Sequence, residues 1–322
     1  MSGALPTVAV NAIEPEPAGA RWLVHDLWGA CAVGIVGGRP KACKSTFGLD
    51  LAVSVASGTA CLDRFEVLNP GPVVVYLAED SLPHIRDRVA QLCRHRGLSL
   101  ATLPLHVVTA PALRLDLPAD RLALEQMLQS LKPTLLLLDP LVRLHRLDEN
   151  NAADISGLLG FLREINRRHR LAVVVVHHMA KRSNRDLGQS LRGSSDLHAW
   201  LDSACYLVRR PDQRVRLTVE HRAAPAREPL LLRLLGGDDQ PLRLLIDSEE
   251  HTSPPLCDSV RNELRRSDRP LSRTALRQKL HVNNARLGDA LSTLEQNGLA
   301  VRSREGWSIS PEHRGCQSDL FV

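Results

Sequence analysis

Short, unbroken apolar segments alternate with helical patterns along most of this chain, and this alternation constrains the fold more than any other feature. A strand that is buried on both faces consists of consecutive apolar residues, because neither face meets water. Strands that alternate with helices form a mostly parallel sheet. The sequence therefore predicts an α/β fold with strands at 32–36, 72–77, 105–108, 134–138, 171–176, 204–208, 215–219 and 230–234.

Helical patterns fill the intervals between the earlier strands, at 44–57, 84–96 and 154–168. The segments from residue 204 onward are more closely spaced and leave little room for crossover helices. We therefore expect these late segments to extend one side of the sheet as antiparallel strands, with 215–219 at the edge.

The chain is expected to form two domains with a loose tail at each end. The α/β pattern covers 21–247, after a tail at 1–20. Polar residues and two prolines mark 248–255 as a linker. Beyond it, 256–310 contains three helical patterns and a hairpin, the layout of a small winged helix-turn-helix domain, and 311–322 forms the second tail.

Composition excludes several classes of protein. No apolar run approaches the ~18 residues that cross a membrane, and the first twenty residues lack the pattern of a secretion signal. The seven cysteines include no CxxC pair, which argues against a disulfide framework or a zinc site. We therefore expect a cytoplasmic protein without a membrane partner. The net charge of +5 permits a nucleic-acid partner without establishing one.

A phosphate-binding loop is predicted between the first apolar strand and the first helix. The segment GRPKACKST matches GxxxxGK[ST], except that Cys43 replaces the second glycine. Lys44 would neutralise phosphate charge and Ser45 would bind Mg²⁺. A thiol at a helix N-terminus is also expected to have a low pKa. The alternative is a strand–helix turn that binds no nucleotide. The predicted nucleotide-binding residues are Gly38, Arg39, Pro40, Lys41, Ala42, Cys43, Lys44, Ser45 and Thr46.

Three further apolar strands end in residues that suit nucleotide hydrolysis. Glu79 follows the second strand and could activate a water molecule, Asp139 ends another and could hold Mg²⁺, and His177 and His178 end a third. The carboxyl ends of parallel strands meet at one edge of a sheet, where ligands bind. Adjacent strand residues point to opposite faces, so the two histidines are not expected to share a metal. Helix capping and a structural histidine are the alternatives.

Together these motifs resemble a known family. The segments GRPKACKST, VVVYLAEDS, LLLLDPLVRLHRLDENN, VVVVHHMAKRSN, LRGSSDL and VEHRAAP resemble, in order and spacing, the RecA-like ATPases of the plasmid RepA-type hexameric helicase group. The resemblance covers about 21–235. It implies ATP and Mg²⁺ as cofactors, bound through Lys44, Ser45 and Asp139. It also implies Glu79 as catalytic base.

The resemblance extends to residues that would act on the γ-phosphate. It implies that the His177–His178 pair is a phosphate sensor. It also implies that Arg222 is an arginine finger for the neighbouring subunit of a homo-oligomer, most simply a hexamer. The family often has Lys two residues before that arginine, where this chain has Glu220.

DNA contacts are expected at two places. The resemblance implies that the polar, cationic stretch after the histidine pair is the loop that faces the channel in RecA-like rings, where its cations would hold the backbone of a single strand. The alternative is a solvated loop that does not contact DNA. A second candidate channel segment is 143–146. In the C-terminal domain, the third helix and the hairpin would contact duplex DNA or a protein. The predicted DNA-binding residues are Lys181, Arg182, Arg185, Arg192, Asn284, Arg286, Arg302 and Arg304.

The sequence thus favours an ATP hydrolase that works as a DNA motor, in the replication of a plasmid, phage or other mobile element. Two other functions stay open. One is an ATP switch that assembles on DNA without translocation and recruits a recombinase or replisome. The other is a transcription regulator that senses nucleotide. Strand polarity, DNA sequence preference and ring size have no signature in the chain.

Overall fold

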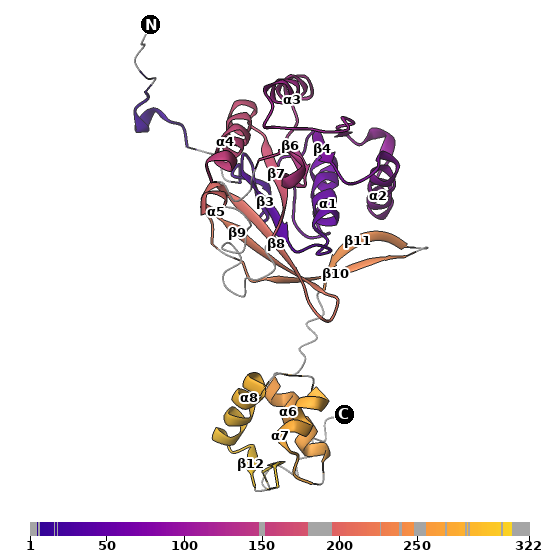
Figure 1. Cartoon of the computed structure of the whole chain (residues 1–322), viewed down its shortest axis with the longest axis vertical. Coiled ribbons are helices and arrows are strands. Elements are labelled where there is room, and N and C mark those ends of the chain that lie inside the picture. The colour runs from indigo at the N-terminus through magenta and orange to yellow at the C-terminus, as the bar shows by residue number, and fades with distance from the viewer. Residues whose placement is uncertain are drawn as a thin grey trace. The chain divides into compact units, whose positions relative to one another are not determined.

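The computed structural model describes residues 5, 7–15, 17, 19–147, 152–179, 195–225, 227–237, 240–247, 256–267, 269–280, 282, 284–303 and 305–310. The chain divides into two compact units, Met1–Asp247 and Ser248–Val322 (Figure 1). Across the described ranges, no helix combines the length and the apolar character needed to cross a membrane.

A nine-stranded sheet forms the centre of the first unit, in the order β11-β10-β9-β8-β3-β7-β6-β4-β5 (Figure 1). The six strands from β5 across to β8 are parallel, and β9, β10 and β11 are antiparallel. The strands are Val33–Gly38 (β3), Val73–Leu77 (β4), Leu105–Val107 (β5), Leu135–Asp139 (β6), Ala172–His178 (β7), Ser203–Arg209 (β8), Val215–His221 (β9), Leu230–Gly237 (β10) and Gln240–Ile246 (β11). A separate hairpin pairs β1 (Trp22–Val24) with β2 (Trp28–Gly29).

Helices cover both faces of this sheet. One face packs on α1 (Lys44–Ser57) and α2 (Leu82–His95), and the other on α3 (Pro118–Leu131), α4 (Ala152–His169) and α5 (Ser195–Trp200). Successive residues of β7 alternate between the two cores, Val174 toward α1 and Val173 toward α4. Because both faces are buried, the strands are apolar without interruption. The predicted α/β fold with a mostly parallel sheet is confirmed.

Two expectations about the late strands are wrong. β8 is parallel to β3, because the chain between β7 and β8 includes α5 and is long enough for a crossover. β9 lies inside the sheet, paired with β8 and with β10. The edge strand on this side of the sheet is instead β11, which the sequence does not predict because Pro241 interrupts its pattern. A proline is tolerated in an edge strand, where one side of the backbone pairs with no neighbour.

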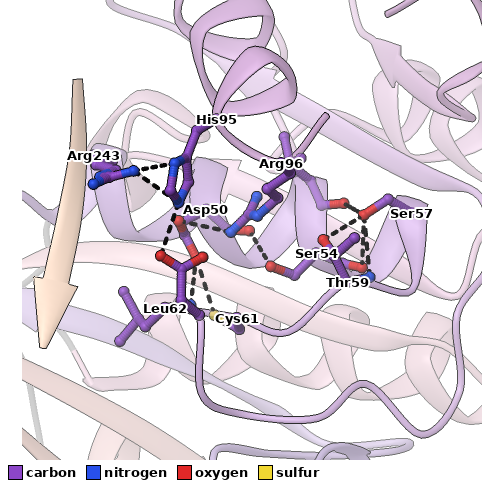
Figure 2. Close-up of polar contacts among 11 residues, drawn as sticks. Asp50, Ser54, Ser57, Thr59, Cys61, Leu62, His95, Arg96 and Arg243 are labelled. Atoms are coloured by element: carbon purple, nitrogen blue, oxygen red, sulfur yellow. Dashed lines mark hydrogen bonds and ion pairs between the residues drawn. The ribbon is translucent and has the colours of Figure 1, made fainter. Parts of the chain in front are cut away.

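A buried ion pair fixes the phosphate-loop helix to its neighbour (Figure 2). Asp50 of α1 lies 2.9 Å from the guanidinium of Arg96, and each side chain is only 4% exposed. The same carboxylate accepts a hydrogen bond from the backbone N–H of Leu62 at 2.9 Å. These contacts tie the middle of α1 to the residue that ends α2 and to the loop that follows α1.

In its described residues, the second unit contains three helices and a two-stranded hairpin, which Figure 1 shows as a separate body. The elements are α6 (Leu256–Arg266), α7 (Arg273–Leu280), α8 (Asn284–Gln296), β12 (Ala300–Arg302) and β13 (Trp307–Ile309). They share a separate core that includes Val260, Leu276 and Leu291. Gly298, with φ of +69°, follows α8, as expected for a glycine that ends a helix.

Candidate functional site

The phosphate loop connects β3 to α1 at the carboxyl edge of the parallel strands. Gly38, which ends β3, lies against β8, and a Cβ there would meet the carbonyl oxygen of Leu207 at 2.5 Å. Cys43 immediately precedes α1 and has φ of +63°, a left-handed conformation that favours glycine. The loop therefore keeps the backbone path that its missing glycine would adopt, with a side chain in its place. Burial raises the pKa of the Cys43 thiol, so the expected low pKa is wrong.

Lys44, the first residue of α1, is folded back into this loop. Its Nζ donates a hydrogen bond to the carbonyl oxygen of Arg39 at 3.0 Å and lies 3.3 Å from Nδ1 of His178. Burial lowers the pKa of Lys44, and the charges of Asp139 and Glu79 partly oppose that shift. A phosphate in the loop would add further negative charge close to this buried ammonium group.

Asp139 ends β6 beside the start of α1. Burial raises its pKa to about 6, against a hydrogen bond from Ser45 and the charge of Lys44. Within the described part of the chain, its Oδ2 atom is buried without a hydrogen-bond partner. A buried carboxylate next to a hydroxyl offers the oxygen ligands that Mg²⁺ prefers, and Mg²⁺ needs few protein ligands when a nucleotide supplies the others. Ser45 and Asp139 therefore fit the predicted metal pair.

Glu79 lies two residues beyond β4 at the same edge. Its Oε1 accepts a hydrogen bond from Nε of Arg143 at 3.0 Å, and both side chains are about half exposed. The following residues have structural partners. Ser81 caps α2 by accepting from the backbone N–H of His84, and Asp80 pairs with Arg88 at 2.7 Å. The capping role considered for this segment thus belongs to Ser81.

The structure separates the two histidines at the end of β7. His177 is 2% exposed and lies on the face of the sheet that packs on α4. His178 lies on the opposite face, the one that carries α1, where it approaches Lys44. Only His178 is therefore beside the phosphate loop.

Arg222 lies at the end of the sheet where the parallel strands begin, opposite the carboxyl ends that carry the phosphate loop. It follows β9, which runs antiparallel to β8, and its neighbour His221 pairs with Ser203 at the start of β8. The other end of β8 holds the phosphate loop, through a hydrogen bond from Arg209 to the carbonyl oxygen of Lys41. A strand of this length separates its ends by about 20 Å. Arg222 therefore cannot contact the phosphate loop of its own chain.

Arg222 borders a cavity of about 730 Å³ at this amino edge, together with Trp22, Asp202 and His221. Its guanidinium lies 3.3 Å from Asp202 and donates to the carbonyl oxygen of Ala199, and its side chain is 53% exposed.

Most predicted DNA-binding residues lie outside the described residues. These are Lys181, Arg182, Arg185, Arg192 and Arg304, together with the side chains of Asn284 and Arg286. Arg302 is exposed on β12, with its guanidinium 5.9 Å from the ring centre of Trp307.

Sequence reasoning missed three arginines that touch the predicted site. Arg143 pairs with Glu79, and Arg209 donates a hydrogen bond to the carbonyl oxygen of Lys41. Arg88, which pairs with Asp80, also donates a hydrogen bond to Oγ1 of Thr46 at 3.3 Å. The sequence indicates Arg143 only as part of the candidate DNA segment 143–146. The other two have no local signal, because their partners are distant in sequence.

Comparisons with known proteins agree with this geometry. The family model AAA_25, described as an AAA domain, matches residues 2–184. The comparison with curated proteins found no match. Among solved structures, the ATPase domain of G40P superposes with a TM-score of 0.50 at 14% identity, covering 64% of this chain and 82% of that one.

Two other solved structures share the fold. The RadB recombinase has a TM-score of 0.50 at 18% identity, with 66% of this chain and 90% of that chain covered. A DnaB-like replicative helicase, solved with attention to its interactions with primase, has a TM-score of 0.50 at 14% identity; the match covers 67% of this chain and 57% of that longer one. Because the family match spans more than half of the residues, the chain belongs to the AAA_25 family of RecA-like P-loop ATPases.

Proposed function

We propose that this protein is an ATP-driven DNA motor that acts as a homo-oligomer, most simply a hexamer, in the replication of a plasmid, phage or other mobile element. One observation carries the proposal: Arg222 lies about a strand length, ~20 Å, from the phosphate loop of its own chain. An arginine so placed can act on the nucleotide of a neighbouring copy. The wider role rests on the resemblance in the motifs.

Each residue at the carboxyl edge has a role in this proposal. Lys44 would bind the β- and γ-phosphates, and Ser45 and Asp139 would hold Mg²⁺, which screens phosphate charge when bound. Glu79 would orient the attacking water and accept its proton. His178 would contact the γ-phosphate, since it already lies beside Lys44. His177, on the other face, keeps a structural role.

The C-terminal unit is proposed to be a winged helix-turn-helix that binds DNA or a partner protein. Three helices followed by a short hairpin support this assignment. The proposed domain bounds are 256–310 for this domain, 248–255 for the linker and 21–247 for the ATPase domain. Removal of residues 256–322 should leave hydrolysis intact and weaken duplex binding, since the two units have separate cores. An inactive truncated chain would show that the second unit completes the first.

The most direct test measures ATP hydrolysis with and without single-stranded DNA, and the mass of the protein with ATP. We expect hydrolysis that rises with the strand, in an assembly of several subunits. Lys44→Ala should abolish hydrolysis. Glu79→Gln should bind ATP without turnover, because an amide cannot accept the proton. Hydrolysis at the wild-type rate in Lys44→Ala would contradict the whole proposal.

A non-translocating ATP switch is the second candidate, and one observation favours it. Cys43 occupies a left-handed position that suits glycine, so the loop is less adaptable to the phosphates than a glycine-containing one. A switch would hydrolyse ATP slowly and would not separate strands. A strand-displacement assay on a forked duplex distinguishes it from a motor.

A further inference from the structure

A polar pocket of about 400 Å³ adjoins Glu79. Tyr76, Arg114 and Arg143 also line it. Two guanidinium groups and one carboxylate give this lining a net positive charge. Such a pocket suits a singly charged phosphodiester, which guanidinium groups bind in a bidentate manner.

Hydrogen bonds from the segment at Arg114 and Leu115 hold the backbone around Arg143. Arg143 ends a single 3₁₀ turn, Leu141–Arg143, that follows β6. Nη1 of Arg114 donates to the carbonyl oxygen of Arg143, and the backbone N–H of Leu115 donates to that of Leu144 at 2.6 Å. The loop thus has fixed backbone contacts, while the Arg143 side chain is 57% exposed and points to Glu79.

The contact between Arg143 and Glu79 opposes the role proposed for Glu79. The guanidinium donates to Oε1, so it occupies a lone pair of the proposed base and holds the carboxylate against the pocket that both residues line. An ion pair between half-exposed side chains is weak. A stronger partner for Arg143 can therefore displace Glu79 without a change of fold.

We propose that Arg143 is a positioning residue that holds Glu79 back in the DNA-free protein and exchanges it for a backbone phosphate of single-stranded DNA bound in this pocket. The inference rests on the proposed function, in which Glu79 is the base. It makes one ion pair the link between strand binding and hydrolysis. Release of Glu79 allows it to approach the attacking water, so the DNA-bound protein turns over faster.

The test compares kcat and KM for ATP, with and without a single-stranded oligothymidine, in four proteins. These are the wild type, Arg143→Gln, Arg143→Lys and the control Arg86→Gln. Arg86 is an exposed arginine of α2 that lies 3.8 Å from the carboxylate of Asp87. Circular dichroism and thermal unfolding check that each variant folds.

Arg143→Gln should raise the DNA-free kcat about two- to five-fold, the range that a half-exposed ion pair supports. The strand should then add no further increase. Arg143→Lys keeps the charge, so it should restore the low DNA-free rate and part of the stimulation. KM for ATP should stay constant throughout, since Arg143 contacts Glu79 rather than the phosphate loop. Arg86→Gln should behave as the wild type.

A DNA-free kcat in Arg143→Gln that equals or falls below the wild-type value overturns the inference, as does full stimulation of that variant by the strand. Activation by sodium sulfate alone would also overturn it, by identifying a simple anion pocket. If the wild type hydrolyses ATP but does not respond to DNA, the inference about Arg143 is wrong, although the protein is still an ATPase. A wild type without hydrolysis removes the proposed function itself.

Discussion

Nδ1 of His178 lies 3.3 Å from Nζ of Lys44, and this contact joins the end of β7 to the first turn of the phosphate-loop helix. A residue in this position could respond to a nucleotide bound at Lys44 and pass the change to the chain that follows β7. The chain beyond β7 continues toward the cationic stretch predicted to bind DNA.

The adjacent histidines provide a matched pair of variants. His178→Asn should lower kcat about a hundred-fold or more with little change in ATP affinity, because it removes the group proposed to contact the γ-phosphate. His177→Asn should lower stability by about 1–3 kcal/mol instead, because His177 is buried on the other face. Steady-state kinetics and thermal unfolding separate the two effects. Equal losses of kcat in both variants would contradict the assignment.

Cys43→Gly should raise the stability of the protein by about 1 kcal/mol, since glycine adopts φ near +63° without the cost that a Cβ carries there. Activity should stay constant or increase. Cys43→Ser is the control, because it keeps the Cβ and should show no gain in melting temperature. With its pKa raised by burial, the thiol should also resist mild oxidant. Rapid loss of activity under oxidant in the wild type alone would contradict this view of the thiol.

Arg222 should act on a neighbouring subunit, and mixed assemblies test this. Lys44→Ala and Arg222→Ala should each be inactive alone. Random mixing at equal amounts joins an intact loop to an intact arginine at about a quarter of the interfaces, so activity should partly return. Arg227→Ala, which removes a nearby arginine paired with Asp26, should stay active. Co-assembly without recovery of activity would exclude a role for Arg222 between subunits.

His221 should make stability depend on pH. Burial lowers its pKa below the usual 6.5, so the unfolded chain takes up a proton at a pH where the folded protein does not. Its contribution is therefore complete above pH 6.5 and is lost as the pH falls toward the depressed folded pKa. In His221→Asn, the free energy of unfolding should decline less between pH 7 and pH 5, measured by urea titration. Parallel declines in both proteins would show that other groups set this dependence.

The sequence predicts the carboxyl edge of the sheet well, because the chemistry there follows from local patterns. Apolar runs locate the strands, and the residue after each run must then lie at the shared edge. Local patterns cannot predict contacts such as that of Arg143 with Glu79 or that of Asp50 with Arg96. They join elements whose side chains meet only once the sheet order and the helix positions are set. The raised pKa of Cys43 cannot be predicted from local patterns for the same reason, because burial depends on the packed loop.

Lys44 and Arg222 lie at opposite ends of the strands, so the number of complete sites depends on how the subunits are arranged. In the proposed assembly, each chain would contribute a phosphate loop to one shared site and Arg222 to the next. In an open row of subunits, the phosphate loop at one end and the Arg222 at the other end have no counterpart. In a closed ring, every phosphate loop faces an Arg222 of a neighbouring subunit. The rate of ATP hydrolysis per subunit would therefore increase when a row closes into a ring. The increase would be largest for short rows, because one incomplete site is a larger fraction of their sites.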